Sequence, residues 1–321
     1  MQMKELGRSG FTTSEFIFGA GSIGGVGSSK ETLGRGITAE QGMDRLDEAV
    51  QLGVRLIDTA DSYAGGRSER AIGEWLADRA PGDVLVATKV GNTPRGTDLS
   101  RSHIERQLAQ SIGRLGRVDL YLSHAPDPST PVAETLEAFT AAREAGSIKA
   151  FGVSNVDAPL LEEILSAAES EGLARPEWVQ NSFSLLDREA ERELLPLVIQ
   201  EGLGFTPFSP LAGGVLSERY LDGRPVESGS RIAVAGDLFY AGMHSPENLK
   251  RVGALRVLAR ERDISVSAMA LAWLRTHPGV TAPIVAPSRA DQWKAVQEAL
   301  ATDLDEAELA LISDIFSPVG R

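Results

Sequence analysis

The clearest transition from a strand to a loop in this chain is Arg55-Leu56-Ile57-Asp58-Thr59-Ala60-Asp61-Ser62-Tyr63. Its short apolar run predicts a buried strand that ends in the carboxylate of Asp58. The phenol of Tyr63 follows five residues later, just before the turn Ala64-Gly65-Gly66. Enzymes of the α/β class keep reactive groups where a strand ends in a loop before a helix. Taken alone, this segment fits a catalytic site and an ordinary structural turn equally well.

A helix followed by a strand recurs on both sides of this segment. Apolar spacing predicts eight strands, each roughly thirty residues from the next except across one insertion, and such parallel strands need helical crossovers. The predicted strands are 16–19, 55–58, 84–89, 119–122, 148–153, 178–180, 204–208 and 282–285. The predicted helices are 38–52, 67–77, one that begins at 100, one that begins at 131, 160–168, 189–200 and 265–276.

Eight helix-and-strand units in 321 residues fit one α/β barrel. We therefore predict a (β/α)8 TIM barrel that forms a single domain over residues 1–321. Three additions to the repeat are expected: an N-terminal β-hairpin within 3–18, a long irregular loop at 212–246 after the seventh strand, and an extra C-terminal helix at 305–316. A doubly wound sheet would not require such a regular repeat.

Composition restricts the class of protein. No apolar run reaches the roughly eighteen residues that a membrane span needs, and a net charge of −13 argues against nucleic acid and anionic membranes as partners. The absence of cysteine excludes disulfides and thiol nucleophiles, and the four histidines are too far apart to suggest a metal site. The first residues lack the basic and apolar parts of a signal peptide, so we expect a cytoplasmic protein.

One short motif suggests a different fold. Gly19-Ala20-Gly21-Ser22-Ile23-Gly24 matches the G-x-G-x-x-G pattern of dinucleotide-binding Rossmann domains. In that fold a helix opens directly at the third glycine, whereas here further glycines continue a loop until about residue 38. We interpret the segment as a glycine-rich rim, and keep a Rossmann-type dehydrogenase that uses Gly19, Gly21 and Gly24 as an alternative.

Polar side chains follow the predicted strands, and in a barrel these strand ends surround one mouth. They are Asp58 with Tyr63 beyond it, Lys89, His124, Ser154 with Asn155, Gln180 and Ser209. Each residue alone has a plain structural explanation. Their collection at one mouth predicts an active site.

Tyr63 is the proton donor that this set of residues favours. A free phenol has a pKa near 10, and a neighbouring Lys89 ammonium is expected to lower it, while Asp58 holds Lys89 charged. His124 is expected to hydrogen-bond a carbonyl oxygen or Tyr63 itself. No G-x-S-x-G motif or other activated nucleophile is present. Protonation of a carbonyl without a metal needs a source of hydride, which implies a nicotinamide cofactor and a small carbonyl substrate.

The chain also resembles the aldo-keto reductase family nearly from end to end. The similar segments are Leu6-Gly7-Arg8-Ser9-Gly10, Ile57-Asp58-Thr59-Ala60-Asp61-Ser62-Tyr63, Thr88-Lys89, Asp119-Leu120-Tyr121-Leu122-Ser123-His124-Ala125-Pro126-Asp127, Gly152-Val153-Ser154-Asn155, Ser209-Pro210-Leu211-Ala212-Gly213-Gly214 and Pro283-Ile284-Val285-Ala286-Pro287-Ser288-Arg289. This resemblance implies a catalytic tetrad of Asp58, Tyr63, Lys89 and His124.

The resemblance further implies the residues that bind the cofactor. Ser154, Asn155 and Gln180 would hold the carboxamide, Phe208 would stack on the nicotinamide ring, and Ser209, Leu211 and Gly213 would contact the pyrophosphate. Ser288 and Arg289 suit a 2′-phosphate, which predicts a preference for NADPH; Gln292 and Gln297 are the other expected cofactor contacts.

These expectations lead to NADPH-dependent reduction of an aldehyde or ketone to an alcohol, with the proton from Tyr63. The alternative within the same fold is a regulatory protein that binds the cofactor without turnover, as do members of the family that serve as channel subunits. The oligomeric state is left open by the sequence.

Overall fold

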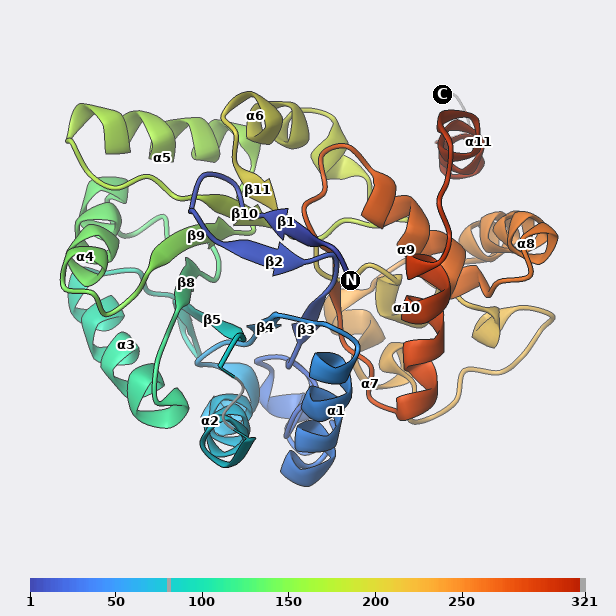
Figure 1. The fold of residues 1–321 in the computed structure, drawn as a ribbon, viewed down its shortest axis with the longest axis horizontal. Helices are drawn as coiled ribbons and strands as arrows, with labels where there is room; N and C mark the ends of the chain where they lie inside the picture. Colours follow the sequence, from blue (N-terminus) through green and yellow to red (C-terminus); the bar gives the residue numbers. More distant parts are fainter. Residues whose placement is uncertain (80–81, 318–321) are drawn as a thin grey trace.

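The computed structural model describes residues 1–79 and 82–317. At its centre lies a curled sheet of parallel strands in the order β11-β10-β9-β8-β5-β4-β3-β12 (Figure 1). Their bounds are β3 Ile17–Gly19, β4 Leu56–Asp58, β5 Leu85–Val90, β8 Leu120–Ser123, β9 Ala150–Ser154, β10 Trp178–Gln180, β11 Gly204–Phe205 and β12 Ile284–Val285. Beyond the ladders, the Thr281 N–H donates to the Phe205 carbonyl and the Ile284 N–H to the Pro207 carbonyl, both at 2.8 Å. These bonds join the two ends of the sheet, and the predicted (β/α)8 barrel is confirmed.

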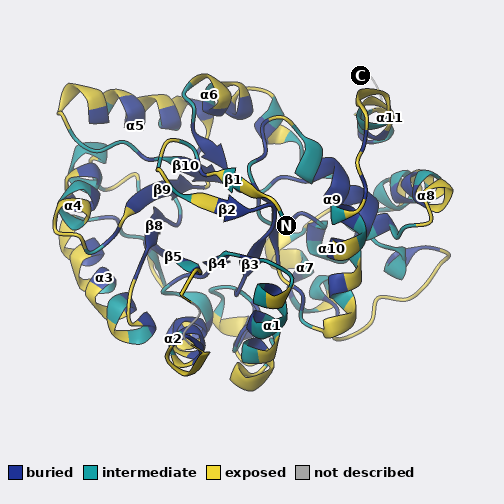
Figure 2. Ribbon diagram, in the orientation of Figure 1, coloured by how far each residue is buried: buried dark blue, intermediate teal, exposed yellow. Residues whose placement is uncertain are grey.

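Helices surround the sheet, with buried faces toward the strands and exposed faces outward (Figure 2). They are α1 Ala39–Gln51, α2 Arg67–Arg79, α3 Arg101–Leu115, α4 Val132–Glu144, α5 Ala158–Ser170, α6 Leu194–Gln200, α9 Val266–Thr276 and α10 Trp293–Leu300, with α7 Arg231–Phe239, α8 Pro246–Glu261 and α11 Glu306–Phe316 added to the repeat. Helix α1 is typical: Thr38 and Gln41 form a capping box, and Leu46 and Ala49 are buried. Within the described residues, no helix is long and apolar enough to cross a membrane.

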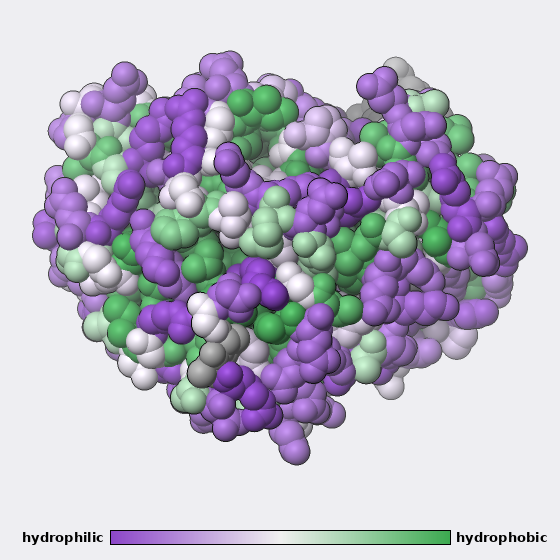
Figure 3. All heavy atoms as spheres, in the orientation of Figure 1, coloured by the Kyte–Doolittle hydropathy of each residue, from purple (hydrophilic) through white to green (hydrophobic). Residues whose placement is uncertain are grey.

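An apolar cluster fills the inside of the barrel and is separate from the larger core beneath the helices. The hairpin of β1 (Met3–Glu5) and β2 (Thr12–Ser14) lies across the end of the barrel that faces the viewer in Figure 1, where Leu6 is 1% exposed. Trp178 belongs to this cluster and packs closely on Gly152, where a Cβ would lie only 2.6 Å from its ring. In the space-filling view of this end, hydrophilic residues surround smaller apolar areas (Figure 3). The barrel is therefore closed at the end opposite to the strands' carboxyl ends.

The structure differs from the predicted elements mainly around the insertion. The expected helix at 189–200 is divided into a 3-10 turn, Glu189–Glu191, and α6. The long connection after β11 contains α7 and is followed by α8, and neither helix was predicted. Both begin at a serine whose side chain accepts a backbone N–H, Ser230 for α7 and Ser245 for α8, so the sequence did carry a capping signal. A short hairpin of β6 (Asn92–Thr93) and β7 (Gly96–Thr97) follows β5.

Candidate active site

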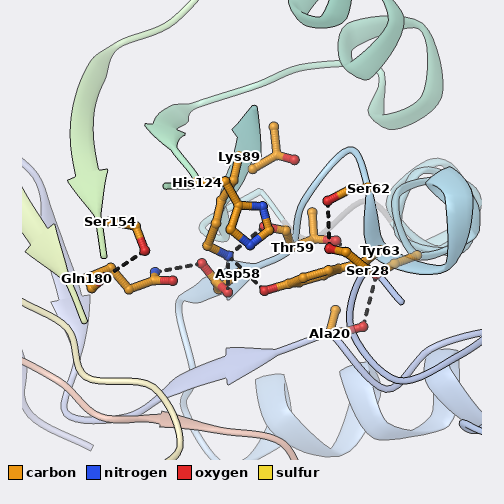
Figure 4. Close-up of polar contacts among 12 residues, drawn as sticks. Ala20, Ser28, Asp58, Thr59, Ser62, Tyr63, Lys89, His124, Ser154 and Gln180 are labelled. Carbon is orange, nitrogen blue, oxygen red and sulfur yellow. Dashed lines mark hydrogen bonds and ion pairs between the residues drawn. The ribbon is translucent and has the colours of Figure 1, made fainter. Parts of the chain in front are cut away.

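The four residues of the predicted tetrad come together at the mouth of the barrel (Figure 4). Asp58 is the last residue of β4, Lys89 lies near the end of β5, and His124 directly follows β8. Tyr63 opens a 3-10 turn, Tyr63–Gly66, that leads into α2. Because β4, β5 and β8 are neighbours in the sheet, their carboxyl ends bring these side chains to one place.

Lys89 is the centre of the polar network. Its Nζ atom donates to Asp58 Oδ2 at 2.7 Å, to the Thr59 carbonyl at 2.8 Å and to the Tyr63 hydroxyl at 3.3 Å. The side chain is 1% exposed, and burial by itself would lower its pKa; the Asp58 carboxylate and Tyr63 outweigh burial and raise the pKa of Lys89 above its ordinary value. Lys89 is therefore an ammonium at neutral pH with all three of its protons in use.

The Tyr63 hydroxyl is protonated at neutral pH. Burial raises the pKa of Tyr63 above its ordinary value, and the Lys89 ammonium offsets only part of that rise. The sequence led us to expect that Lys89 would bring this pKa toward neutrality; the sign of its effect is as expected, but burial is larger. The phenol thus carries the proton that a donor needs.

His124 meets Tyr63 edge-on, with ring centroids 5.6 Å apart and an interplanar angle of 81°. Burial, helped by the Lys89 charge, lowers the pKa of His124 to about 3. The imidazole is therefore neutral and carries one N–H. Its Nδ1 atom is buried without a hydrogen-bond partner in the part of the chain that the structure describes. A neutral ring beside a phenol suits hydrogen bonding to a substrate oxygen rather than proton transfer.

The three residues expected to hold a carboxamide, Ser154, Asn155 and Gln180, lie beside the tetrad. Ser154 Oγ donates to the Gln180 carbonyl at 2.6 Å, and Asn155 Nδ2 donates to the His124 carbonyl at 2.8 Å. Gln180 Nε2 donates to Asp58 Oδ1 at 2.9 Å, a link that sequence spacing did not indicate. Asn155 Oδ1 and Gln180 Oε1 accept no hydrogen bond from the described residues. These two side-chain oxygens can therefore accept hydrogen bonds from the N–H groups of a carboxamide.

The loop after β11 forms the part of the barrel mouth that lies next to the long insertion. Phe208 is half-buried against the inner core, and Ser209 has a φ of 56°. Leu211 precedes a 3-10 turn, Ala212–Gly214, in which Gly213 has a φ of 68°. The hydroxyl of Tyr240, at the end of α7, shares a 3.3 Å hydrogen bond with Ser209 Oγ. Sequence analysis missed Tyr240, since no local pattern relates it to a loop 31 residues earlier.

The turn expected to bind a 2′-phosphate lies between β12 and α10. Arg289 is exposed, and its guanidinium is paired with both carboxylate oxygens of Asp291, at 3.0 and 3.1 Å. Gln292 Oε1 accepts the backbone N–H of Ser288 at 2.7 Å and that of Arg289 at 3.2 Å. Gln292 thus shapes the turn through its oxygen, while the exposed guanidinium of Arg289 is engaged by Asp291.

Two residues of α10 lie on different sides of the helix. Gln297 is exposed, where a ligand can reach it. Trp293 is buried, stacks on Phe18 with ring centroids 6.1 Å apart and donates to Glu48 Oε2 at 2.8 Å. Trp293 therefore packs α10 against the barrel.

Comparison with known proteins decides the family. A model described as "Aldo/keto reductase family" matches residues 15–316. The chain belongs to the aldo/keto reductase family. As a member with relatives named as oxidoreductases, it is an NAD(P)H-dependent oxidoreductase.

Individual relatives of this aldo/keto reductase have diverse names. It is 33% identical to "Probable voltage-gated potassium channel subunit beta" of Oryza sativa subsp. japonica, over 91% of this chain and 89% of that one. It is 31% identical to "Uncharacterized oxidoreductase YrpG" of Bacillus subtilis (strain 168), over 100% of this chain and 97% of that one. It is 28% identical to "NADH-specific methylglyoxal reductase" of Escherichia coli (strain K12), over the whole of both chains.

No metal site accompanies the tetrad in residues 1–79 and 82–317, where no group of three or more His, Asp or Glu side chains could hold an ion.

Proposed function

We propose that the protein reduces an aldehyde or ketone to an alcohol with NADPH as the source of hydride and Tyr63 as the source of the proton. The observation that carries the proposal is the contact of the Tyr63 hydroxyl with Lys89 Nζ at 3.3 Å, while Lys89 is held by Asp58 at 2.7 Å. A bound nicotinamide supplies the hydride. The chain itself supplies the acid and the charges that stabilise it.

Each member of the tetrad has a separate task in this proposal. Tyr63 gives its proton to the carbonyl oxygen, and the Lys89 ammonium stabilises the phenolate that remains. Asp58 keeps Lys89 charged and in place, and Gln180 holds the second oxygen of Asp58. His124 donates a hydrogen bond to the same carbonyl oxygen, which favours charge on that oxygen as the hydride arrives. Asp58 and Gln180 act without touching the substrate.

Ser288 and Arg289 support NADPH as the cofactor, since a hydroxyl and a guanidinium suit a 2′-phosphate. Asp291 opposes that preference, because its carboxylate is paired with Arg289 and repels a phosphate. The 2′-phosphate would have to take the guanidinium from Asp291. Fluorescence titration with NADPH and with NADH measures the outcome directly: tighter binding of NADPH supports this part of the proposal, and tighter binding of NADH contradicts it.

Substitution of Tyr63 by Phe tests the role of the acid. With a reactive aromatic aldehyde as substrate, Tyr63→Phe is expected to lower kcat by at least about 100-fold and to leave the Kd of the cofactor unchanged, because only the proton donor is removed. Tyr220→Phe is the matched control: the Tyr220 hydroxyl is buried outside the site and has no partner among the described residues. Unchanged turnover in Tyr63→Phe would exclude Tyr63 as the donor.

A regulatory protein that binds the cofactor without turnover is the second candidate. It is favoured by the 33% identity to a protein named as a potassium channel subunit. An aldehyde and ketone panel distinguishes the two functions. Tight NADPH binding without consumption across the whole panel would favour the regulatory protein.

A further inference from the structure

The glycines of the G-x-G-x-x-G segment all lie where another part of the barrel comes close. A Cβ at Gly19 would lie 2.7 Å from Ile284 Cγ2. One at Gly21 would lie 3.4 Å from the ring of Tyr63. Gly24, with a φ of 78°, lies against Arg67, where a Cβ would be 3.1 Å from the arginine Cβ. Close approach thus explains Gly19 and Gly24 of the pattern that resembles a nucleotide-binding motif, whereas a Cβ at Gly21 would make ordinary contact with the Tyr63 ring. Gly21 and Gly24 both face the segment around Tyr63.

The same glycine-rich loop is hydrogen-bonded to both sequence neighbours of Tyr63. Ser28 Oγ and Ser62 Oγ share a bond of 2.8 Å, which is drawn in Figure 4. The Ala64 N–H donates to the Gly27 carbonyl at 3.0 Å. The Gly27 N–H in turn donates to the Gly21 carbonyl at 2.7 Å, which closes the loop on itself.

We infer that the segment from Gly21 to Ser28 positions Tyr63 for proton transfer, with Ser28 as a positioning residue that acts through Ser62. This inference rests on the proposed function. The Tyr63 hydroxyl is held at its tip by one bond to Lys89, and its ring meets His124 edge-on. The remaining constraints on the ring are the backbone on either side and the surface behind it. The glycine-rich segment supplies all three: Ser28 fixes Ser62, Gly27 fixes Ala64, and Gly21 backs the ring.

The bond between Ser28 and Ser62 is suited to this task and to a test. Both serines are half-buried, so water can satisfy their partners when one hydroxyl is removed. Loss of the bond should therefore loosen the turn without unfolding the barrel. The turn itself is under local strain, since Ala64 has a φ of 49°, and needs such contacts to keep its shape.

The first experiment measures kcat, KM and the Kd of NADPH for Ser28→Ala, Ser62→Ala and the double variant. Each single change is expected to lower kcat by about 3- to 10-fold with the Kd of NADPH unchanged, and the double variant should be no slower than either single one. Ser28→Thr, which keeps a hydroxyl, should restore the rate. Ser170→Ala, an exposed serine at the end of α5, is the matched control and should leave the rate unchanged.

Gly21→Val separates positioning from phosphate binding. Its branched side chain would push on the Tyr63 ring, so kcat should fall by about 100-fold while the Kd of NADPH is unchanged. A nucleotide-binding glycine predicts the reverse result, a loss of NADPH binding. That result would overturn the inference.

A second readout does not depend on turnover. Tyrosinate absorbance, with Tyr63→Phe to identify the contribution of Tyr63, follows the ionisation of this phenol in the parent and in Ser28→Ala. Burial raises the pKa of Tyr63 and Lys89 lowers it, and displacement of the ring alters both effects, so the pKa should differ between the parent and Ser28→Ala. An unchanged Tyr63 titration in Ser28→Ala overturns the inference. A shifted titration in a protein that reduces no carbonyl would support the inference and reject the proposed function.

Discussion

The buried ion pair between Lys89 and Asp58 should make a large contribution to the stability of the folded protein. Their side chains are 1% and 6% exposed, and the Nζ to Oδ2 distance is 2.7 Å. Lys89→Met leaves the Asp58 carboxylate buried with only the Gln180 amide as a partner. Removal of one member of a buried ion pair costs about 3–5 kcal/mol. At about 2 °C for each kcal/mol in a large domain, the melting temperature should fall by roughly 6–10 °C.

Circular dichroism melts at neutral pH measure this change. The double variant Asp58→Asn, Lys89→Met removes both charges and should recover at least about half of the loss, because no uncompensated charge stays buried. Arg192→Met is the control: its pair with Glu189 is exposed at 70% and 74%, and its loss should leave the melt unchanged. The reasoning fails if Lys89→Met melts like the parent, or if the double variant melts no higher than Lys89→Met.

Three further outcomes follow from the same structure. The pKa of His124 is about 3 in the folded protein and about 6.5 when unfolded. The contribution of neutral His124 to stability is therefore complete above about pH 6.5 and falls by about 1.4 kcal/mol per pH unit below it. The melting temperature of the parent should decline more on acidification than that of His124→Gln. Gly152→Ala should lower the free energy of unfolding by about 1–3 kcal/mol in urea melts, because its Cβ would lie 2.6 Å from the indole of Trp178. Gly253→Ala in α8, whose Cβ would meet nothing within 4 Å, should instead stabilise the protein. Arg289→Ala should weaken NADPH binding and not NADH binding, and Asp291→Asn should strengthen NADPH binding by releasing the guanidinium, as titration of each cofactor would measure.

The barrel and the tetrad were predictable because their signals are local. Each strand is a short apolar run, and a barrel repeat places the residue after every run at the same mouth. Asp58, Lys89 and His124 could therefore be grouped without any knowledge of distances. The chemistry of a phenol beside an ammonium then suggested their tasks, and the family resemblance implied the same tetrad.

The features that sequence reasoning missed depend on contacts between distant segments. Gln180 reaches Asp58 across 122 positions, and Tyr240 reaches Ser209 through a helix that was not predicted. The pKa of Tyr63 was misjudged for a related reason: the charge of Lys89 is visible in the sequence, but the extent of burial is not. The glycine-rich segment was interpreted only as a rim, and nothing in the sequence indicated that it lies against Tyr63.

The hairpin under the barrel has a practical consequence for experiments on this protein. It carries the N-terminus (Figure 1) on the end of the barrel opposite to the carboxyl ends of the strands, where Asp58, Lys89 and His124 lie. An affinity tag or a surface linker joined to Met1 would therefore hold the protein with its mouth toward the bulk solution. Immobilisation through this terminus should leave cofactor and substrate free access, which makes it the attachment point of choice for a biosensor or a packed-bed reactor.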